Sequence, residues 1–133
     1  MYEKLRLHYG REPVHLPGSE DGNCLFHALS YALGGYVTHA ELRAAACGVL
    51  SSPSFIRRYR PFLEEDWGGY VSRMRRSGEW GDAFVILALA QLLGCHITVV
   101  SGGYSQNFKA HRTQKRIFLA YEGNHYEPTR LRA

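Results

Sequence analysis

Cys24 follows a run of turn-forming residues, Gly18-Ser-Glu-Asp-Gly-Asn23, and begins a predicted helix. Unpaired backbone N–H groups and the helix dipole favour negative charge at such a position, which stabilises a thiolate. Gly22 allows a turn tight enough to aim neighbouring N–H groups at one spot, as an oxyanion hole requires. The pattern indicates a thiol nucleophile at Cys24, and a small, buried, unreactive cysteine is the alternative.

A thiol nucleophile needs a general base, and His125 is the histidine best placed to be one. It follows the turn Glu122-Gly-Asn124 on a predicted strand, and Glu127 lies two residues further on. Since side chains alternate along a strand, His125 and Glu127 share one face. The carboxylate could hold one imidazole nitrogen and leave the other facing the thiol, whereas a merely packed or solvated histidine is the alternative.

The remaining candidates for chemistry have simpler interpretations. Cys47 and Cys95 fall inside a predicted helix and a predicted strand, where a cysteine usually acts as a small hydrophobic residue. His27 lies three residues beyond Cys24 on the same helix, so a metal pair or a thiolate partner is conceivable, but packing within the helix is favoured. We expect no metal and no organic cofactor.

The composition is that of an ordinary globular protein. The 133 residues are 45% apolar and 21% charged, and a chain of this length can bury one core without disulfides or metals. We therefore expect one domain over residues 1–133 and a monomer. Three widely spaced cysteines without a C-x-x-C pair argue against a disulfide framework and a zinc knuckle, and favour a reducing compartment.

Charge and hydropathy exclude several function classes. The longest apolar stretch, residues 83–93, is 11 residues long, whereas a membrane-spanning helix needs about 20. The first ten residues have no export signal, so we expect a cytoplasmic protein without a membrane partner. The net charge is +4, but the arginines stand in separated groups, which disfavours nucleic acid as a partner.

The elements that must position these residues follow from hydrophobic periodicity. Four helices are predicted, over residues 24–33, 38–50, 61–76 and 83–93. The second begins with the capping box Thr38-His-Ala-Glu41, and Asp82 caps the fourth. The third has Pro61 at its first position and acids at 64–66 in its first turn. Residues 95–100 and 116–121 are predicted strands, and residues 125–127 should be extended. We expect an irregular start and loops at 51–59 and 101–115. Helices first and a small sheet last predict an α+β domain.

Three motifs together resemble the ovarian-tumour (OTU) family of cysteine proteases. They are Asp21-Gly-Asn-Cys-Leu-Phe-His-Ala-Leu29, Gly78-Glu-Trp-Gly81 before an apolar helix, and Gly123-Asn-His-Tyr-Glu127. They occur in the family's order and span most of the chain. The resemblance implies a papain-like α+β fold, with helices packed on a small, mostly antiparallel sheet.

The resemblance also implies an activity, a partner and site residues. The activity is hydrolysis of isopeptide or peptide bonds after the C-terminal glycine of ubiquitin or polyubiquitin, with Cys24 as nucleophile and His125 as base. In this family the imidazole is oriented either by the residue two places after the histidine, usually Asp or Asn, or by the aspartate three before the cysteine. Here these positions are Glu127, a departure, and Asp21. Both stay open, with Glu127 favoured because it shares a strand face with His125.

Further residues receive roles by the same resemblance. The backbone N–H groups of Asp21, Gly22, Asn23 and Cys24 would form the oxyanion hole. Substrate binding is expected at Trp80, Asn124 and Tyr126, with Trp80 either a wall of a channel that admits glycine or a core residue under the central helix. Nearby acids could pair with the arginines of ubiquitin's tail: Glu79, Asp82 and Glu122.

Alternative functions stay open at this point. The same chemistry could act on a ubiquitin-like modifier or on a junction in a viral polyprotein, and a viral or bacterial-effector origin would place the chain in the cytosol of a host cell. An inactive ubiquitin-binding module is a different class, supported only by the Glu127 departure. Linkage preference would depend on the loops at 51–59 and 101–115, and the sequence does not specify it.

Overall fold

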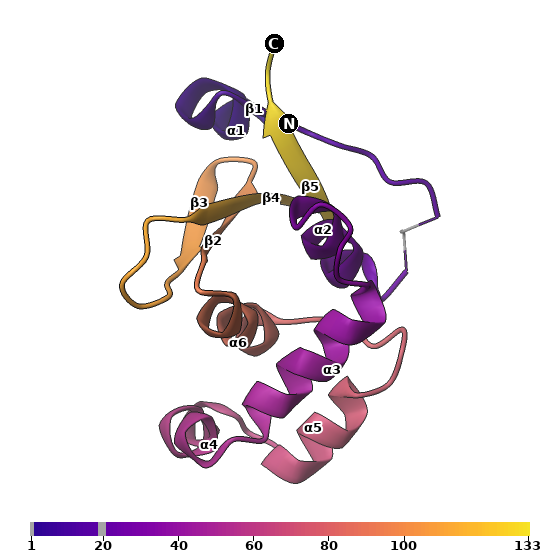
Figure 1. Ribbon diagram of the computed structural model, residues 1–133, viewed down its shortest axis with the longest axis vertical. Coiled ribbons are helices and arrows are strands. Elements are labelled where there is room, and N and C mark those ends of the chain that lie inside the picture. Colours follow the sequence, from indigo (N-terminus) through magenta and orange to yellow (C-terminus); the bar gives the residue numbers. More distant parts are fainter. Residues whose placement is uncertain (1, 19–20) are drawn as a thin grey trace.

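The computed structural model describes residues 2–18 and 21–133 (Figure 1). In chain order its helices are α1 (Glu3–Tyr9), α2 (Cys24–Ala32), α3 (His39–Leu50), α4 (Pro53–Tyr59), the 3-10 turn η1 (Arg60–Phe62), α5 (Trp67–Met74) and α6 (Ala83–Leu93). Its strands are β1 (Arg11–Pro13), β2 (His96–Ser101), β3 (Tyr104–Phe108), β4 (Arg116–Glu122) and β5 (His125–Leu131). Among the described residues, no helix is long and apolar enough to cross a membrane.

The five strands form one mixed sheet in the order β1-β5-β4-β2-β3. Among the described residues β2 and β4 pair in parallel, and the other three pairs of neighbouring strands are antiparallel. In Figure 1 the sheet fills the upper half, helices α3, α4 and α5 fill the lower half, and α2 and α6 lie between them. The predicted α+β class, with helices packed on a small and mostly antiparallel sheet, is confirmed.

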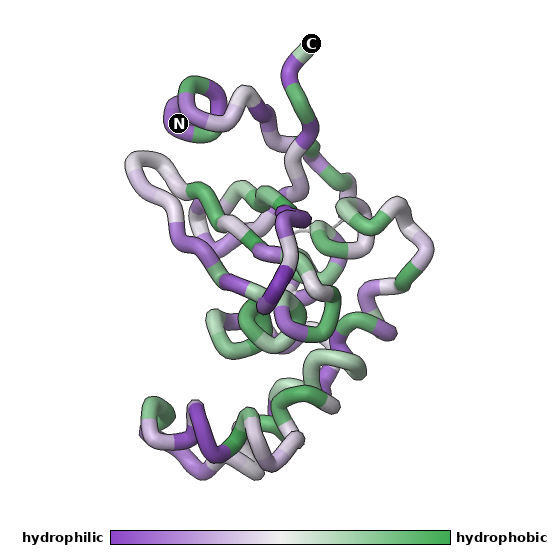
Figure 2. Tube along the Cα trace, turned by 60° about the vertical axis from the view of Figure 1, so that its left-hand side comes forward, coloured by the Kyte–Doolittle hydropathy of each residue, from purple (hydrophilic) through white to green (hydrophobic). Residues whose placement is uncertain are grey.

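Helix α6 is the centre of the core. Its side chains are buried at Val85, Ile86, Ala88, Leu89 and Ala90, and it packs against both α3 and β2. The Asp82 carboxylate accepts from Val85 N–H at 3.1 Å and begins the helix, as predicted. Figure 2 shows hydrophobic stretches of the tube in the middle of the molecule and others along the lower helices.

Two helices bring the candidate site together. Helix α2 begins at Cys24 and packs along β5, so the cysteine lies beside the strand that begins with His125. Helix α3 begins with the predicted capping box, in which Thr38 and Glu41 bond each other's backbone N–H groups. Its face toward α2 and α6 is buried.

The prediction for residues 51–76 was wrong in its first half. Residues 53–59 form α4, not a loop, because Ser52 caps the helix and Pro53 occupies its first position. The next helix begins only at Trp67, because the Asp66 side chain accepts from Gly69 N–H at 2.9 Å. The acids at 64–66 therefore precede the helix, and Pro61 lies in η1.

Three short elements lie where irregular chain was expected. Helix α1 and strand β1 fall within the first 17 residues, and β3 falls within the predicted loop 101–115. β3 pairs antiparallel with β2, although its sequence, Tyr-Ser-Gln-Asn-Phe, is polar. β1 pairs with β5, and α1 packs Leu5 against Val100 and Ala120, so these two elements depend on contacts far away in sequence that local patterns do not reveal. β3 pairs with its neighbour β2 across the short turn at Gly102-Gly103, a hairpin that the sequence analysis missed.

Candidate active site

The thiol of Cys24 lies where the start of α2 meets the start of β5. The residue is 1% exposed, and the Tyr126 N–H points at its Sγ with an N–S distance of 3.5 Å. The Cys24 N–H donates to the Asp21 carbonyl at 3.1 Å, which closes the turn before the helix. Two segments about a hundred residues apart in sequence therefore contact each other at the sulfur.

Burial raises the pKa of the Cys24 thiol. The backbone N–H groups of Tyr126 and Leu25 act in the opposite direction, and the negative charge of Asp21 raises the pKa further. The sequence argument predicted a stabilised thiolate at a helix N-terminus, but burial outweighs that effect here. A protonated thiol needs a neighbouring base before it can act as a nucleophile.

His125 is the first residue of β5, and its side chain is 21% exposed. Both ring nitrogens are buried, and within residues 2–18 and 21–133 neither has a hydrogen-bond partner. Its Nε2 lies 3.9 Å from Glu127 Oε2, so the two side chains occupy one face of the strand at a distance slightly too long for a hydrogen bond. A carboxylate next to Nε2 leaves Nδ1 as the nitrogen available to a thiol.

Glu127 has a second partner, His15, that the sequence analysis missed. His15 Nδ1 lies 3.2 Å from the same carboxylate oxygen, Oε2. The segment that carries His15 runs beside β5, because the N–H of Val14 donates to the Pro128 carbonyl at 2.8 Å. No spacing rule could reveal this contact, since the two residues are 112 positions apart.

Asp21, the other predicted orienting acid, is engaged in its own turn. Its Oδ1 accepts from Asn23 N–H at 2.9 Å, which is an Asx turn. Glu127 is therefore the acid that the fold places against His125, and the Asp21 carboxylate shapes the turn before Cys24.

The turn also decides which backbone N–H groups face outward. The N–H groups of Asn23 and Cys24 already donate to the Asp21 side chain and carbonyl. Because carbonyl and N–H point in opposite directions in a trans peptide, the Gly22 N–H points away from the interior of the turn. In the described part of the chain nothing accepts from the N–H groups of Gly22 and Asp21, so these two of the four predicted oxyanion donors have no acceptor there.

Gly22 is required for a different reason than the one predicted. Its φ is not in the left-handed region, but a Cβ at this position would lie 1.6 Å from the Gly78 carbonyl oxygen. The backbone of residues 77–82 therefore packs directly on the backbone of the turn. Gly81 makes a similar approach, since a Cβ there would lie 2.5 Å from a methyl carbon of Leu25.

Trp80 lies on the rim of a cleft, so its interpretation as a core residue is wrong. Its side chain is 49% exposed, because the loop that carries it lies on the surface beside the Cys24 turn. It borders a cavity of about 280 Å³ with Gly81, Tyr121, Asn124 and Tyr126. The three residues expected to bind substrate, Trp80, Asn124 and Tyr126, thus line one cavity.

A second cavity, of about 160 Å³, continues the cleft past Tyr121 and Tyr126 toward α6 and the β2–β3 hairpin. Burial raises the pKa of Tyr126 to about 12, so this hydroxyl stays protonated at neutral pH. The cleft is consequently walled by neutral aromatic side chains.

Asn124 also determines where β5 begins. Gly123 and Asn124 have φ values of +56° and +62°, which is the backbone of a type I′ hairpin turn. The Asn124 side chain accepts from the Tyr121 hydroxyl at 3.0 Å. This turn pairs Glu122 with His125 and fixes the register that puts His125 and Glu127 on one face.

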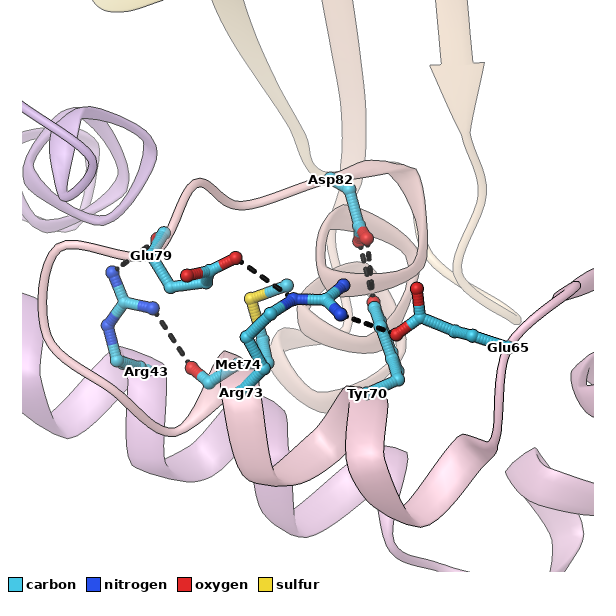
Figure 3. Close-up of polar contacts among 7 residues, drawn as sticks. All are labelled: Arg43, Glu65, Tyr70, Arg73, Met74, Glu79 and Asp82. Carbon is cyan, nitrogen blue, oxygen red and sulfur yellow. Dashed lines mark hydrogen bonds and ion pairs between the residues drawn. The ribbon is translucent and has the colours of Figure 1, made fainter.

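Two of the acids expected to meet ubiquitin's arginines are already used within the chain. Glu79 accepts from Arg73 Nε at 3.0 Å, and Asp82 accepts from the Tyr70 hydroxyl at 2.8 Å while capping α6 (Figure 3). Both acids therefore hold the loop between α5 and α6. Glu122, at the end of β4, also has a partner, the Tyr2 hydroxyl, so none of the three acids is free of contacts within the chain.

Cys47 and His27 have the structural roles that the sequence favoured for them. Cys47 is buried in α3, and burial raises the pKa of its thiol. The His27 ring packs on the His39 ring with centroids 4.2 Å apart, which agrees with the packing interpretation of this residue.

Residues 19–130 match the model of a protein family described as OTU-like cysteine protease. The chain belongs to this family. Its curated relatives include mouse OTU domain-containing protein 1, which is 30% identical over 84 residues, 62% of this chain and 18% of that protein. Ovarian tumor domain-containing deubiquitinating enzyme 10 of Arabidopsis thaliana is 37% identical over 91 residues, 66% of this chain and 24% of that protein. Mouse ubiquitin thioesterase OTU1 is 28% identical over 118 residues, 81% of this chain and 33% of that protein. This OTU chain thus spans a third or less of the length of these relatives.

Solved structures show the same fold. The OTU domain of OTUD1 superposes with a TM-score of 0.77 at 23% identity, covering 97% of this chain and 91% of that one. The viral OTU domain protease of Dera Ghazi Khan virus also gives 0.77, at 17% identity, over 96% and 85% of the two chains. The Hazara virus OTU bound to ubiquitin gives 0.62 at 23% identity, over 92% and 82%. The predicted OTU fold is confirmed.

One buried residue of this OTU domain was missed entirely. Arg43 is 4% exposed, and its guanidinium bonds the turn that carries Cys24. The sequence did contain a signal for its burial. Arg43 shares a helix face with Cys47 and Leu50 at i, i+4 and i+7 spacing, and a charged residue is unusual on such an apolar face.

Proposed function

We propose that this OTU domain is a deubiquitinase, which hydrolyses the isopeptide or peptide bond after the C-terminal glycine of ubiquitin. The observation that carries the proposal is the meeting of Cys24 with the first residues of β5. There the Tyr126 N–H contacts the thiol, and the His125 ring nitrogens have no partner in the described chain. Glu127 Oε2 lies 3.9 Å from His125 Nε2, which supports the roles of Cys24, His125 and Glu127 as the thiol, base and acid of one site.

The names of relatives support ubiquitin as the partner. Curated relatives are called deubiquitinating enzyme and ubiquitin thioesterase, and similar solved structures include an OTU domain in complex with ubiquitin and a viral OTU bound to ubiquitin. The chain carries the Cys and His positions of the family motifs, at Cys24 and His125.

The first half of the proposed reaction activates the thiol. His125 Nδ1 takes the Cys24 proton as Sγ attacks the glycine carbonyl carbon, and a tetrahedral oxyanion forms. The Gly22 N–H faces outward to meet this oxyanion. The positive charge that develops on His125 is stabilised by Glu127 next to Nε2.

The second half releases both products. His125 returns the proton to the leaving lysine amine as the carbon–nitrogen bond breaks, which leaves ubiquitin attached to Cys24 as a thioester. A water molecule, deprotonated by the same imidazole, then attacks the thioester, and the thiol leaves with the proton. Each bond and proton is accounted for by the chain, the substrate and one water, so no cofactor is required.

The cleft suits a peptide that ends in glycine. Trp80 and Tyr126 line the cavity that also includes Gly81 and Asn124. Flat aromatic walls leave room for residues without side chains and exclude branched ones. We place the terminal Gly-Gly of ubiquitin between Trp80 and Tyr126, and the remainder of ubiquitin outside the cavity.

Hydrolysis of a fluorogenic amide at the C-terminus of ubiquitin tests the proposal. We expect Cys24→Ala and His125→Gln each to lower kcat by at least about 1000-fold, as loss of a nucleophile or base does. Cys95→Ala is the matched control, and we expect its kcat to stay within about twofold of wild type. Cys95 lies directly before β2, not inside the strand as predicted, and among the described residues it makes no hydrogen bond to a candidate site residue.

Other outcomes point to other functions. Hydrolysis retained in Cys24→Ala would refute the mechanism. A folded wild-type chain that binds ubiquitin without hydrolysing it would instead be a ubiquitin-binding module. If the chain hydrolyses only a ubiquitin-like modifier and not ubiquitin, that modifier is the substrate and the proposed mechanism is unchanged.

A further inference from the structure

Arg43 is a buried cation with hydrogen bonds to three separate segments. Its guanidinium donates to the Met74 carbonyl at 3.0 Å, the Glu79 carbonyl at 2.8 Å and the Asn23 side-chain oxygen at 2.6 Å. It also approaches the Gly22 carbonyl at 3.4 Å. Figure 3 shows the guanidinium reaching from α3 toward the end of α5 and the loop after it.

Among the described residues no carboxylate lies within ion-pair distance of Arg43; burial lowers the pKa of its guanidinium by more than the charges of Glu79 and Asp21 raise it. Within the described chain no ion pair includes Arg43, and its guanidinium lies 4.3 Å from the centre of the Phe26 ring. Burial of a cation among neutral carbonyls and one aromatic face is costly. An apolar side chain would fill the space at lower cost, so stability alone does not account for this residue.

Asn23 connects Arg43 to the nucleophile. Its side-chain oxygen accepts from both Arg43 and the Gly78 N–H, the latter at 2.9 Å, and its amide nitrogen lies 3.3 Å from the Ser77 hydroxyl. The next residue in the chain is Cys24. We call residues 21–24 the nucleophile turn and residues 77–82 the Trp80 loop.

We propose that Arg43 is a positioning residue, which holds the nucleophile turn and the Trp80 loop in the arrangement that the reaction needs. This inference rests on the proposed function. The guanidinium fixes the Gly22 carbonyl and the Asn23 side chain from behind. It thereby holds the Cys24 sulfur and the outward Gly22 N–H relative to Trp80 on the cleft rim.

The proposal predicts an effect on turnover rather than on binding. If Arg43 is replaced by methionine, the cleft walls remain, but the Gly22 N–H and the sulfur lose their fixed geometry. We expect kcat to fall by about tenfold or more, because misplacement of reacting groups by an ångström costs up to about 100-fold, while KM stays within about twofold. Arg43→Lys should fall similarly, since an ammonium cannot reach three carbonyls at once.

Arg73→Met is the matched control. Arg73 lies on neighbouring α5 and donates to the Glu79 and Glu65 side chains, but among the described residues it makes no hydrogen bond to the nucleophile turn (Figure 3). Its kcat should stay within about twofold of wild type. Asn23→Ala should reproduce the loss seen in Arg43→Met. The double variant Asn23→Ala/Arg43→Met should be no worse than either single one, because both changes break one network.

Each result decides the proposal. A kcat of Arg43→Met equal to that of wild type, an equal loss in Arg73→Met, or additive losses in the double variant would overturn it. If Arg43→Met does not fold at the assay temperature, Asn23→Ala carries the same test, because it leaves Arg43 with its other carbonyl acceptors.

Hydrogen exchange separates this inference from the proposed function. In Arg43→Met, amide exchange should accelerate in both the nucleophile turn and the Trp80 loop. In Arg73→Met it should accelerate at most in the Trp80 loop. This readout needs no ubiquitin, so it supports or overturns the role of Arg43 even if wild type proves inactive on ubiquitin.

Discussion

Replacement of Glu127 by glutamine should slow turnover by about 30-fold. The glutamine keeps the shape of the side chain and removes its charge. At the observed separation of 3.9 Å, a carboxylate and an imidazolium attract by about 4 kcal/mol if the effective dielectric constant is about 20. The Glu127 oxygen that faces His125 also contacts His15, so we assign about half of this attraction, about 2 kcal/mol, to His125. An energy of this size corresponds to roughly a 30-fold change in rate.

This attraction exists only while His125 is charged, which is in the transition state and the intermediate. The loss should therefore appear in kcat with little change in KM. The assay is steady-state hydrolysis of a fluorogenic ubiquitin amide by wild type, Glu127→Gln and Asp21→Asn. Asp21→Asn is the matched control, because its oxygen can still accept from the Asn23 N–H.

We expect the kcat of Asp21→Asn to stay within about threefold of wild type, since the asparagine preserves the turn and the lost charge is not the one that lies against His125. The reverse result would refute the assignment of the orienting acid. If Asp21→Asn lost about 30-fold and Glu127→Gln stayed near wild type, the turn carboxylate would orient His125 instead.

Three further predictions concern the turn, the cleft and alkaline stability. Gly22→Ala should lower the melting temperature by several degrees, because its Cβ would overlap the Gly78 carbonyl. Gly48→Ala, in α3 with open space around it, should instead stabilise by about 0.5–1 kcal/mol, and equal destabilisation by both would contradict the packing argument. Trp80→Ala should raise KM for the ubiquitin amide by about tenfold with a melting temperature near that of wild type, since the side chain is half exposed; an unchanged KM would remove Trp80 from the substrate site. Burial raises the pKa of Tyr126 to about 12, so as the pH rises the unfolded chain loses this phenolic proton before the folded chain does. The contribution of Tyr126 to the free energy of unfolding is therefore fully present below about pH 10 and is lost between about pH 10 and 12. Urea denaturation of Tyr126→Phe at pH 9 and pH 11.5 should show a smaller decline than wild type, and an equal decline would show that Tyr126 is not the source.

Local sequence patterns were sufficient for the elements that carry their own signals. The capping box at Thr38 and the Asp82 cap before an apolar run begin α3 and α6 where they were predicted. The helix at Cys24 and the hairpin at Gly123-Asn124 follow from turn chemistry in the same way. These signals place the thiol and the imidazole on defined elements.

Contacts between distant segments could not be read from the sequence. The proximity of His15 to Glu127 depends on the segment after β1 running beside β5. The need for glycine at position 22 depends on the approach of Gly78, not on the conformation of the turn itself. Such approaches arise only when the helices and the sheet have packed, so they have no local periodicity.

Buried polar residues are the other class that pattern reasoning passed over. Arg43 lies on an apolar helix face, and hydropathy alone would have placed it in solvent. Its partners are backbone carbonyls and an amide side chain, and these carry no charge pattern to detect. The residue stands out only as a violation of the expected pattern, and such violations often mark constrained sites.

The central claim is that Cys24 is the nucleophile for the C-terminus of ubiquitin. Reaction of the chain with ubiquitin that carries an electrophile in place of its last glycine, followed by intact mass and peptide mapping, tests it most directly. We predict one ubiquitin adduct on Cys24, lost in Cys24→Ala and retained in Cys47→Ala, whose thiol is buried in α3. An adduct on any other residue, or none from a folded wild-type chain, would contradict the account.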